Sequence, residues 1–400
     1  MIIQPKIRGF ICTTAHPVGC DENVRQQIEY VKKQPAILNG PKNVLVVGAS
    51  TGYGLASRIA VAFGCKAATI GVFFERPVEN KRTATAGWYN TVAFEKYAKA
   101  QGLYTKNFNG DAFSDEMKKN VIAAIKKDLG KLDLIIYSLA SPRRVHPKTG
   151  QVAKSVLKPL GIPYTNKSID FETKEVIEVT LPAATEDEVK QTVSVMGGED
   201  WEMWIDALDQ AQLLSSGVRT IAYSYIGPQI TTAVYRRGTI GAAKDHLEQT
   251  AKRLDERFRK KGGRALISVN KALVTQSSSA IPFIPLYFVL LMKVMKEKGV
   301  HEDCIAQIYR LFSKRLYTGK DIPVDCEGRI RIDDLETRED IQKKVQGLWE
   351  NVDTQNVQEI ADVKGYEEDF LKLFGFGFPN VDYSADVNPD INFNPLSSSC

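Results

Sequence analysis

The chain has 400 residues, of which 43% are hydrophobic and 25% are charged, the balance of a globular protein with a sizeable core. Its formal net charge of +5 comes without a block of like charges, which disfavours a nucleic-acid-binding arm. The six cysteines form no CxxC pair and the four histidines show no metal-ligand spacing, so we expect reduced thiols and no metal site. The start has no apolar signal segment, and the most apolar run, Ile281–Met292, is too short to span a bilayer. We therefore expect a cytoplasmic protein without membrane insertion.

Apolar strands and amphipathic helices alternate along the first 142 residues. Such alternation predicts βαβ units and a parallel sheet. A helix capped by Ser114 and ended by Gly130 is predicted between the third and fourth strands. The four predicted strands are, in chain order, Val44–Val47, "ATIGVFFE" ending at Glu75, "LYTKNFNGDA" reaching Asp111, and "LDLIIYSLAS".

The alternation stops at about Arg143 and returns after Gly217. The intervening residues contain turn signals, a predicted hairpin around "SIDFETKEVIEV" and a helix around "EDWEMWIDAL", so they are interpreted as an insertion. The strands "RTIAYSYIG" and "RALISVNKALVT" then complete a doubly wound Rossmann sheet of about six or seven parallel strands with helices on both faces. The last hundred residues are mixed helical, and "NPDINFNPLSSSC" is predicted to be a loosely held tail.

One enlarged domain accounts for this organisation. Its predicted parts are an N-terminal segment (1–42), a dinucleotide-binding core (43–142 and 217–280), the insertion (143–216) and a substrate-covering C-terminal extension (281–400).

The stretch "GASTGYG", Gly48 to Gly54, follows the first strand and opens a helix, where a dinucleotide fingerprint is required. Its glycines permit a tight turn, and the helix N-terminus offers N–H groups to a pyrophosphate. The GxxxGxG spacing is the variant of the short-chain dehydrogenase/reductase superfamily. A structural turn is the alternative, but the strand–turn–helix context favours a cofactor site.

Acidic residues end the second and third strands. Glu75 lies twenty-one residues after Gly54, where a carboxylate accepts hydrogen bonds from the adenosine ribose and repels a 2′-phosphate. We therefore expect NADH rather than NADPH, although the neighbouring Arg76 is of a type that can receive the phosphate. Asp111 is placed to meet the adenine amino group, and the small residues in Leu139-Ala140-Ser141 suit a cofactor passing over the fourth strand.

Tyr235 and Lys244 stand nine positions apart with Gly238 and Gly241 between them. On one helix they would lie about 180° apart, so they converge only if Tyr235 precedes the helix and Lys244 lies on it. Thr239 is the expected cap. Lys244 falls on the apolar stripe of this helix, which indicates either a snorkelling lysine or a ribose hydroxyl partner in a cofactor cleft.

The preceding strand carries an alanine, Ala222, where the ordinary short-chain reductase carries a serine. Tyr225 is the alternative phenol donor, suited to an enolate oxygen. Backbone amides of "ALVT" and the side chain of Thr275 are expected to hold the nicotinamide carboxamide.

The whole chain resembles the FabV-type enoyl-acyl-carrier-protein reductases and the bacterial trans-2-enoyl-CoA reductases, an enlarged branch of the short-chain superfamily. The resemblance lies in "GFICTTAHPVGC", "VVGASTGYGLASRIAVAFG", "NGDAFSDE", "YSLASPRR", "VMGGEDWEMWIDAL", "AYSYIG" and "SVNKALVTQSSSAIPFIPLY", and in the Tyr-x8-Lys spacing of Tyr235 and Lys244.

The resemblance implies NADH-dependent reduction of the 2,3 double bond of an enoyl thioester of acyl carrier protein or coenzyme A, the last step of the fatty acid elongation cycle. It implies Tyr235 as proton donor, Lys244 at the nicotinamide ribose, Tyr225 as a substrate contact, and a monomer. The other implied cofactor-binding residues are Gly48, Ala49, Ser50, Thr51, Gly52, Tyr53, Phe74, Glu75, Asp111, Ala112, Leu139, Ala140, Leu273, Val274 and Thr275. Ile281, Phe283, Ile284 and Tyr287 are expected either to cover the acyl chain or to form a plain core helix.

Two alternatives remain from the residues alone: a short-chain carbonyl reductase or alcohol dehydrogenase, and a dinucleotide-binding sensor without turnover. Ala222 and the long tyrosine–lysine spacing count against the first, and the intact pair counts against the second. Arg143, Arg144, Arg236 and Arg237 are candidates for contact with a carrier phosphate.

Overall fold

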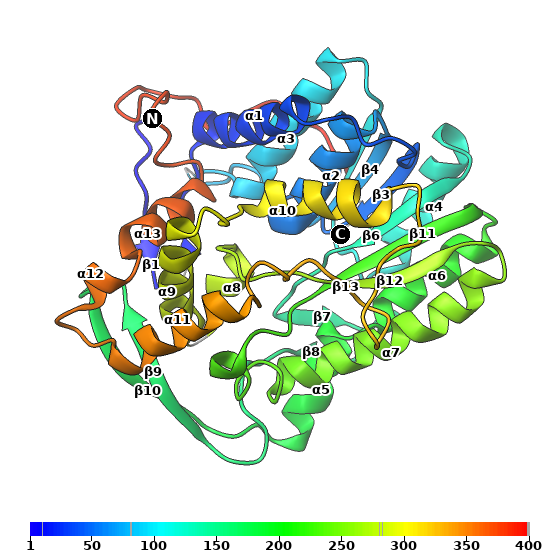
Figure 1. The fold of residues 1–400 in the computed structure, drawn as a ribbon. Helices are drawn as coiled ribbons and strands as arrows, with labels where there is room; N and C mark the ends of the chain where they lie inside the picture. The colour runs from blue at the N-terminus through cyan, green and yellow to red at the C-terminus, as the bar shows by residue number, and fades with distance from the viewer. Residues whose placement is uncertain (10, 81, 280, 282, 398–400) are drawn as a thin grey trace.

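A sheet of eight parallel strands forms the centre of the computed structural model, which describes residues 1–9, 11–80, 82–279, 281 and 283–397. The strand order is β13-β12-β11-β6-β3-β4-β5-β14 (Figure 1). Six longer strands give the doubly wound order that the sequence predicts, and two-residue strands extend both edges. The strands are β3 (Asn43–Val47), β4 (Ala68–Phe73), β5 (Thr105–Asn109), β6 (Leu132–Tyr137), β11 (Leu214–Ser224), β12 (Arg264–Val269), β13 (Ile330–Arg331) and β14 (Leu396–Ser397).

The central strands are continuous apolar runs because both faces of the sheet are covered. In β3, Val44 to Val47 have no exposed surface, and they pair in parallel with β4 on one side and β6 on the other. The chain turns one way after β3 and the other way after β6, so a crevice opens at the carboxyl ends of these two strands.

Helices cover the two faces. One layer, with α1, α2, α3 and α10, packs on the side of Val44 and Val46, and the other, with α4, α6 and α7, on the side of Leu45 and Val47 (Figure 1). The predicted cap is confirmed, because the Ser114 hydroxyl accepts a hydrogen bond from Met117 N at 3.1 Å. The bounds are α1 (Pro17–Lys33), α2 (Gly52–Gly64), α3 (Ala86–Ala100), α4 (Asp115–Asp128), α6 (Glu199–Gln210), α7 (Thr239–Arg259) and α10 (Cys304–Leu311).

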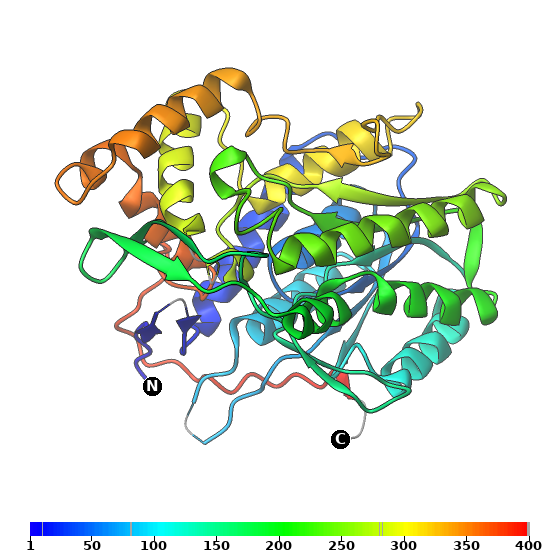
Figure 2. The same cartoon turned by 90° about the horizontal axis from the view of Figure 1, so that it is seen from below.

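Residues 143–216 contain antiparallel pairs outside the central sheet. The predicted hairpin is confirmed as β9 (Tyr164–Asp170) paired with β10 (Glu175–Leu181). A short pair, β7 (Arg143–Val145) and β8 (Val152–Lys154), lies beside α5 (Glu186–Met196). The β9–β10 hairpin projects toward the C-terminal helices (Figure 2), where Val176 N donates to Thr354 Oγ1 at 3.0 Å.

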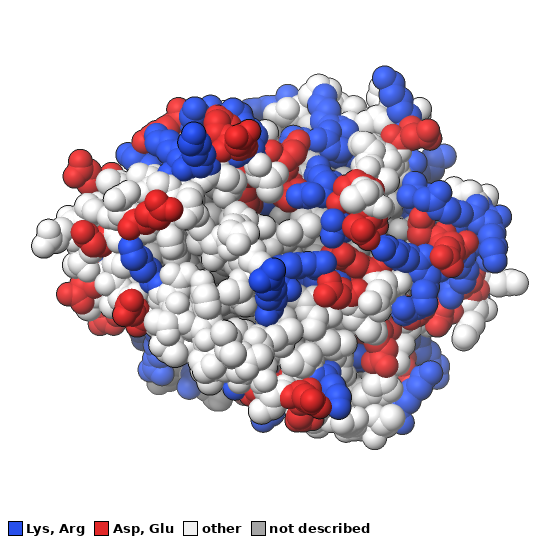
Figure 3. Space-filling view, turned by 60° about the horizontal axis from the view of Figure 1, so that its bottom comes forward, with Lys and Arg blue, Asp and Glu red and all other residues white. Residues whose placement is uncertain are grey.

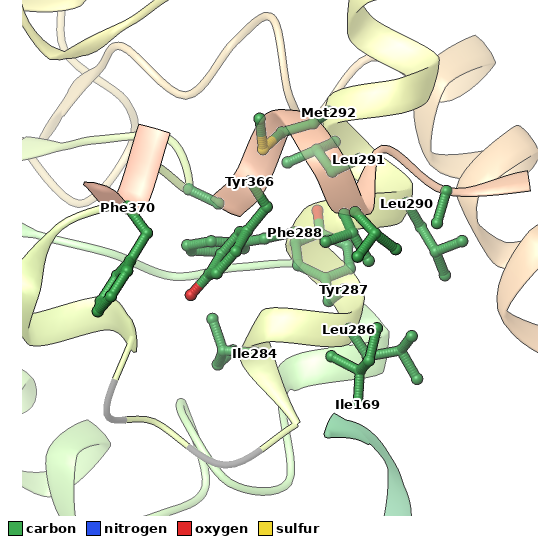
Figure 4. Close-up of a cluster of buried hydrophobic side chains, with 14 of the residues drawn as sticks. Ile169, Ile284, Leu286, Tyr287, Phe288, Leu290, Leu291, Met292, Tyr366 and Phe370 are labelled. Carbon is green, nitrogen blue, oxygen red and sulfur yellow. The ribbon is translucent and has the colours of Figure 1, made fainter. Parts of the chain in front are cut away.

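The C-terminal helices pack around α9 (Ile284–Glu297), whose apolar side chains, with those of α13, form a buried cluster (Figure 4). Proline 282 of the predicted apolar run lies outside the described residues. No helix among those described is long and apolar enough to cross a membrane. The remaining elements are β1 (Ile7–Arg8), β2 (Ile11–Cys12), η1 (Gln229–Thr231), α8 (Gln276–Ser279), η2 (Phe312–Leu316), α11 (Glu339–Asn351), α12 (Val357–Ile360) and α13 (Val363–Lys372).

The prediction of a loosely held tail is wrong for residues up to 397. This segment crosses the molecule (Figure 2) and ends as β14, which pairs in parallel with β5. The Phe393 ring packs edge-on against Trp88 with 5.1 Å between centroids, and the Tyr89 hydroxyl donates to the Pro389 carbonyl at 2.8 Å. The polar, proline-containing composition is typical of a loose tail. The contacts that hold this segment could not be predicted from it, because they are made with residues about 300 positions away.

Candidate active site

One cavity of about 1780 Å³ opens at the carboxyl ends of the central strands. It brings together residues of β4, β6 and β11 and of the segments that follow β3, β4, β5, β6, β11 and β12. Of the residues predicted for catalysis, for cofactor binding and, at Tyr225, for substrate contact, Ala49 alone is not part of its lining, since that side chain is 1% exposed beneath the glycine turn. The others in the lining are Gly48, Ser50–Tyr53, Phe74, Glu75, Asp111, Ala112, Leu139, Ala140, Tyr225, Tyr235, Lys244 and Leu273–Thr275.

Two glycines allow the turn after β3 to close. A Cβ atom on Gly48 would lie 2.3 Å from the Ser138 carbonyl oxygen, and one on Gly54 would lie 1.8 Å from the Gly48 carbonyl oxygen. Gly48 also has a φ of 89°, which disfavours other residues. Thr51, the N-cap of α2, makes no side-chain capping bond, so the first N–H groups of the helix remain available to an anion at the cavity.

Glu75 stands beside this turn, two residues after β4. The Ser50 hydroxyl donates to Glu75 Oε1 at 2.7 Å, and burial raises the pKa of the carboxyl. A Cβ on Gly87 would lie 2.0 Å from the same oxygen, so the second residue of α3 is a glycine where the carboxylate needs room. Arg76 is exposed and does not line the cavity, which leaves Glu75 as the charged group at the expected ribose position.

The adenine end of the expected site is built by the segment after β5. Asp111 Oδ1 accepts a hydrogen bond from Phe113 N at 2.9 Å, which shapes the turn. A buried lysine beneath it, Lys118, donates to the Ala112 and Phe113 carbonyls at 3.2 and 2.9 Å and to Asp200 at 2.7 Å. The position of the Asp111–Phe113 turn is therefore set by a buried ion pair between α4 and α6.

Tyr235 lies in the turns before α7 and Lys244 lies within α7, the arrangement that the spacing required. The expected cap is wrong: Gly238 is the N-cap, and the Thr239 N–H donates to the Lys158 carbonyl at 2.9 Å from inside the helix. Lys244 Nζ donates to the Tyr223 carbonyl at 3.0 Å, and burial lowers the pKa of this lysine to about 8. Its other two protons remain for groups in the cavity.

The Tyr235 and Tyr225 rings meet edge to face, with centroids 4.8 Å apart and planes at 85°. Burial raises the pKa of Tyr235 while the Arg236 charge opposes this, so the phenol is protonated at neutral pH and can act as a donor. Among the described residues its hydroxyl has no hydrogen-bond partner, although Tyr235 lines the cavity.

Tyr225 does not present a free proton, contrary to the expectation from sequence. Its hydroxyl donates to Glu336 Oε1 at 2.9 Å. Glu336 and the neighbouring Lys271 are both buried, and sequence reasoning missed both. Lys271, directly after the apolar strand β12, carried the same signal as Lys244, a lysine where the pattern is apolar. Glu336, 111 residues beyond Tyr225, carried none.

The segment after β12 differs in detail from expectation. Thr275 N–H already donates to Ser278 Oγ at 2.9 Å, so that amide is not free for a carboxamide in this arrangement. Ile281 and Ile284 line the cavity, as an acyl-chain cover should. Phe283 and Tyr287 do not, because Phe283 packs against Tyr164 at 5.7 Å between ring centroids and Tyr287 is fully buried in the α9 cluster (Figure 4).

The four arginines suggested for a carrier phosphate have different surroundings. Arg143 lines the cavity and Arg237 is exposed, whereas Arg236 pairs with carboxylates of α7. Arg144 is 1% exposed and bonds Glu199 at 2.6 Å, so it cannot meet a carrier. On the face in Figure 3, basic and acidic side chains are interspersed around a broad uncharged area.

A doubly wound sheet, a glycine turn at its switch point and a tyrosine–lysine pair in the same cavity define a dinucleotide-dependent oxidoreductase. Comparisons with known proteins specify which. Residues 82–317 match the model of the trans-2-enoyl-CoA reductase catalytic region, and residues 2–80 match that of the NAD(P)H binding domain of trans-2-enoyl-CoA reductase. The chain therefore belongs to the trans-2-enoyl-CoA reductase family.

Individual relatives agree over the full length. The chain is 58% identical to a trans-2-enoyl-CoA reductase [NADH] of Ruminiclostridium cellulolyticum and 59% identical to an enoyl-[acyl-carrier-protein] reductase [NADH] of Flavobacterium johnsoniae, in each case over 99% of this chain and 100% of the relative. The crystal structure of Treponema denticola trans-2-enoyl-CoA reductase in complex with NAD superposes with a TM-score of 0.95 at 52% identity, covering 98% of this chain and 100% of that one.

Residues 324–387 match a model described as an enoyl reductase FAD binding domain, but their structure does not fit a flavin site. Helices α11, α12 and α13 bury apolar side chains such as Val345 and Phe370 in the α9 cluster. Within 324–387 the structure has one two-residue strand, β13, and no strand–glycine turn–helix like that at Gly48–Gly54. No step is assigned to a flavin.

Proposed function

We propose that this chain reduces the trans-2,3 double bond of enoyl thioesters, carried by acyl carrier protein or coenzyme A, with NADH as reductant. The observation that carries the proposal is the Tyr235 hydroxyl, which has no hydrogen-bond partner in the part of the chain that the structure describes and lies in the same cavity as the glycine turn, beside the lysine-bearing face of α7. Saturated acyl thioesters are the product, as in the last step of fatty acid elongation.

The residues proposed to hold the dinucleotide follow the cavity from end to end. The α2 N-terminus and the Gly48–Tyr53 turn face the pyrophosphate, Glu75 the adenosine ribose and Asp111–Ala112 the adenine, while Leu139–Ala140 and Leu273–Thr275 lie toward the nicotinamide. The bound cofactor supplies a hydride to C3 of the substrate. Glu75 favours NADH because a 2′-phosphate would stand against a carboxylate.

Tyr235 is proposed as the proton donor. As negative charge develops on the thioester oxygen, the phenol donates a hydrogen bond to it, and one proton, supplied by Tyr235 and replaced from water, is then taken up at C2 of the enolate. Lys244, held through the Tyr223 carbonyl, directs its remaining protons to the nicotinamide ribose and adds positive charge that eases proton loss from Tyr235.

We further propose that the chain acts as a cytoplasmic monomer without membrane insertion, built as one enlarged domain with the parts 1–42, 43–142 with 217–280, 143–216 and 281–400. The cavity supports a single domain, because its lining draws on all four of these parts, for example Tyr30, Lys244, Arg143 and Lys372.

The test is oxidation of NADH, and separately of NADPH, by purified protein with crotonyl-CoA, with the product identified by mass spectrometry. We expect butyryl-CoA and a strong preference for NADH. Tyr235→Phe should lose turnover by about 10²–10⁴-fold while retaining NADH affinity, since general acid catalysis contributes on that order. Tyr104→Phe, which removes an exposed hydroxyl outside the cavity, is the matched control.

Three results would contradict the proposal. A hydroxyacyl or alcohol product would indicate a carbonyl reductase. NADH binding without turnover on short or long enoyl thioesters would indicate a sensor. Full activity of the Tyr235→Phe protein would remove Tyr235 as the donor.

A further inference from the structure

A buried carboxylate, that of Glu336, accepts hydrogen bonds from three separate segments around the active site. Glu336 lies in the turn between β13 and α11 and has no exposed surface. Its Oε1 accepts hydrogen bonds from the hydroxyls of Tyr225 and Tyr287 at 2.9 and 2.7 Å, and its Oε2 accepts one from Ala272 N at 2.6 Å. These donors come from the end of β11, from α9 and from the segment after β12.

The turn itself is held from several sides. Thr337 N donates to the Asp333 carbonyl at 2.9 Å, and the Arg331 guanidinium grips the Asp333 carboxylate at 2.8 and 2.6 Å. Gln342 Nε2 donates to the Glu336 carbonyl at 2.7 Å. The backbone that delivers the carboxylate is thus fixed without Tyr225, while Gln342 Nε2 also donates to the Tyr287 hydroxyl at 3.1 Å.

Burial raises the pKa of Glu336, while the bonds from Ala272 N and from the two tyrosine hydroxyls, together with the Lys271 charge, oppose that shift and favour the ionised carboxylate. Lys271, 2% exposed, supplies the compensating charge nearby and donates to the Ala272 carbonyl at 3.0 Å. Hydrogen bonds to a charged group are the stronger kind, so the Tyr225 proton is firmly held.

The two active-site phenols therefore differ. The Tyr225 hydroxyl donates a hydrogen bond to Glu336 and its ring stands edge-on to Tyr235, while the Tyr235 hydroxyl has no partner among the described residues. We propose that Glu336 is a positioning residue of the reductase: by fixing the Tyr225 hydroxyl it fixes the ring against which Tyr235 packs, and it leaves Tyr235 as the phenol that donates to the substrate. This inference rests on the role proposed for Tyr235.

The experiment is a double-mutant cycle with Glu336→Gln, Tyr225→Phe and their combination. Each single variant should lower kcat by about 10-fold or more, the worth of a hydrogen bond to a buried charge, with the KM for NADH unchanged. The double variant should be no slower than Glu336→Gln alone, because both changes break the Tyr225–Glu336 bond and only Glu336→Gln also alters the bonds to Tyr287 and Ala272. Tyr287→Phe removes the other tyrosine from the same oxygen, and its kcat should stay within about 3-fold of the wild type.

A folded Glu336→Gln protein with wild-type kcat would overturn the proposal. So would losses that multiply in the double variant, because Tyr225 would then act on the substrate by itself. If Glu336→Gln does not fold, Tyr225→Phe and Tyr287→Phe decide. Equal losses of kcat in these two variants would mean that any lost bond to Glu336 disturbs the site, and would reject positioning through Tyr225.

Thermal unfolding of the wild type, the Glu336→Gln and Tyr225→Phe variants and the double variant, all without substrate, provides a readout independent of turnover. Coupling between positions 225 and 336 should appear there as non-additive shifts in Tm, and additive shifts would contradict the bond. If the wild-type protein does not reduce enoyl thioesters, the proposed function fails. The unfolding measurement can still test the Tyr225–Glu336 bond, because it does not depend on turnover.

Discussion

At the residue scale, the half-buried Lys244 makes activity depend on pH. Burial lowers the pKa of this ammonium to about 8, so the charge is present below that pH and is lost as pH rises through it. If the charged form serves the reaction, kcat/KM for NADH, which reports the free enzyme, should fall above about pH 8. A pH profile of initial rates measures this.

Lys271 is the competing explanation, because burial also lowers its pKa to about 8. Lys244→Met should be slower at every pH and show no limb near 8. If kcat/KM for NADH still falls above about pH 8 in that variant, the fall belongs to Lys271 or another group.

Single residues could be predicted from sequence where a local pattern exposed them. Lys244 interrupts an apolar stripe, and Glu75 ends a strand at a fixed distance from the glycine turn, and both line the cavity. The sequence singles out Tyr225 but predicts that its hydroxyl donates to the substrate. In the structure it donates to Glu336, a residue 111 positions away that no local pattern connects with Tyr225. Partners related only by the fold leave no local pattern.

At the scale of elements, the turn between β3 and α2 depends on close backbone approach. Gly54→Ala would place a methyl group 1.8 Å from the Gly48 carbonyl oxygen, which backbone atoms cannot easily relieve. We expect the NADH dissociation constant, measured by fluorescence titration, to rise at least about 10-fold, corresponding to 1.4 kcal/mol or more.

The control for this variant is Gly347→Ala, inside α11, where the added methyl group meets nothing within 4 Å. It should leave NADH binding unchanged and stabilise the helix by about 0.5–1 kcal/mol. Unaltered binding by Gly54→Ala would mean that the turn does not hold the dinucleotide.

Elements were predicted well where periodicity was strong, as in the six longer strands and the hairpin of residues 164–181. The β14 strand and the cap of α7 were not. The β14 strand has only two residues and forms by pairing with β5. The N-cap of α7 is Gly238 rather than the expected Thr239, and a β-bridge between Gly238 and Pro159 holds it there. Both depend on tertiary contacts rather than on local propensity.

At the scale of the whole molecule, one enlarged domain should unfold as a unit. Leu290 has no exposed surface at the centre of the α9 cluster, so Leu290→Ala should cost about 2–5 kcal/mol. Hydrogen exchange measured by mass spectrometry should show the same loss of protection in β3 as in α9, because their slowest amides exchange through global unfolding.

Lys364→Ala, at a side chain that is 89% exposed, is the matched control and should change stability by less than about 0.5 kcal/mol. Loss of protection confined to α9, α11 and α13 after Leu290→Ala would show instead that the C-terminal helices form a separate unit.

The measurement that tests the central claim most directly is the fate of the transferred hydrogens. NADH carrying deuterium at nicotinamide C4, on the transferred face, would be mixed with crotonyl-CoA and this protein, and the product analysed by NMR. The account predicts one deuterium at C3 of butyryl-CoA and, in a parallel reaction in D2O with unlabelled NADH, one at C2. Deuterium from the cofactor at C1 or C2 of the product, or none in the product at all, would contradict it.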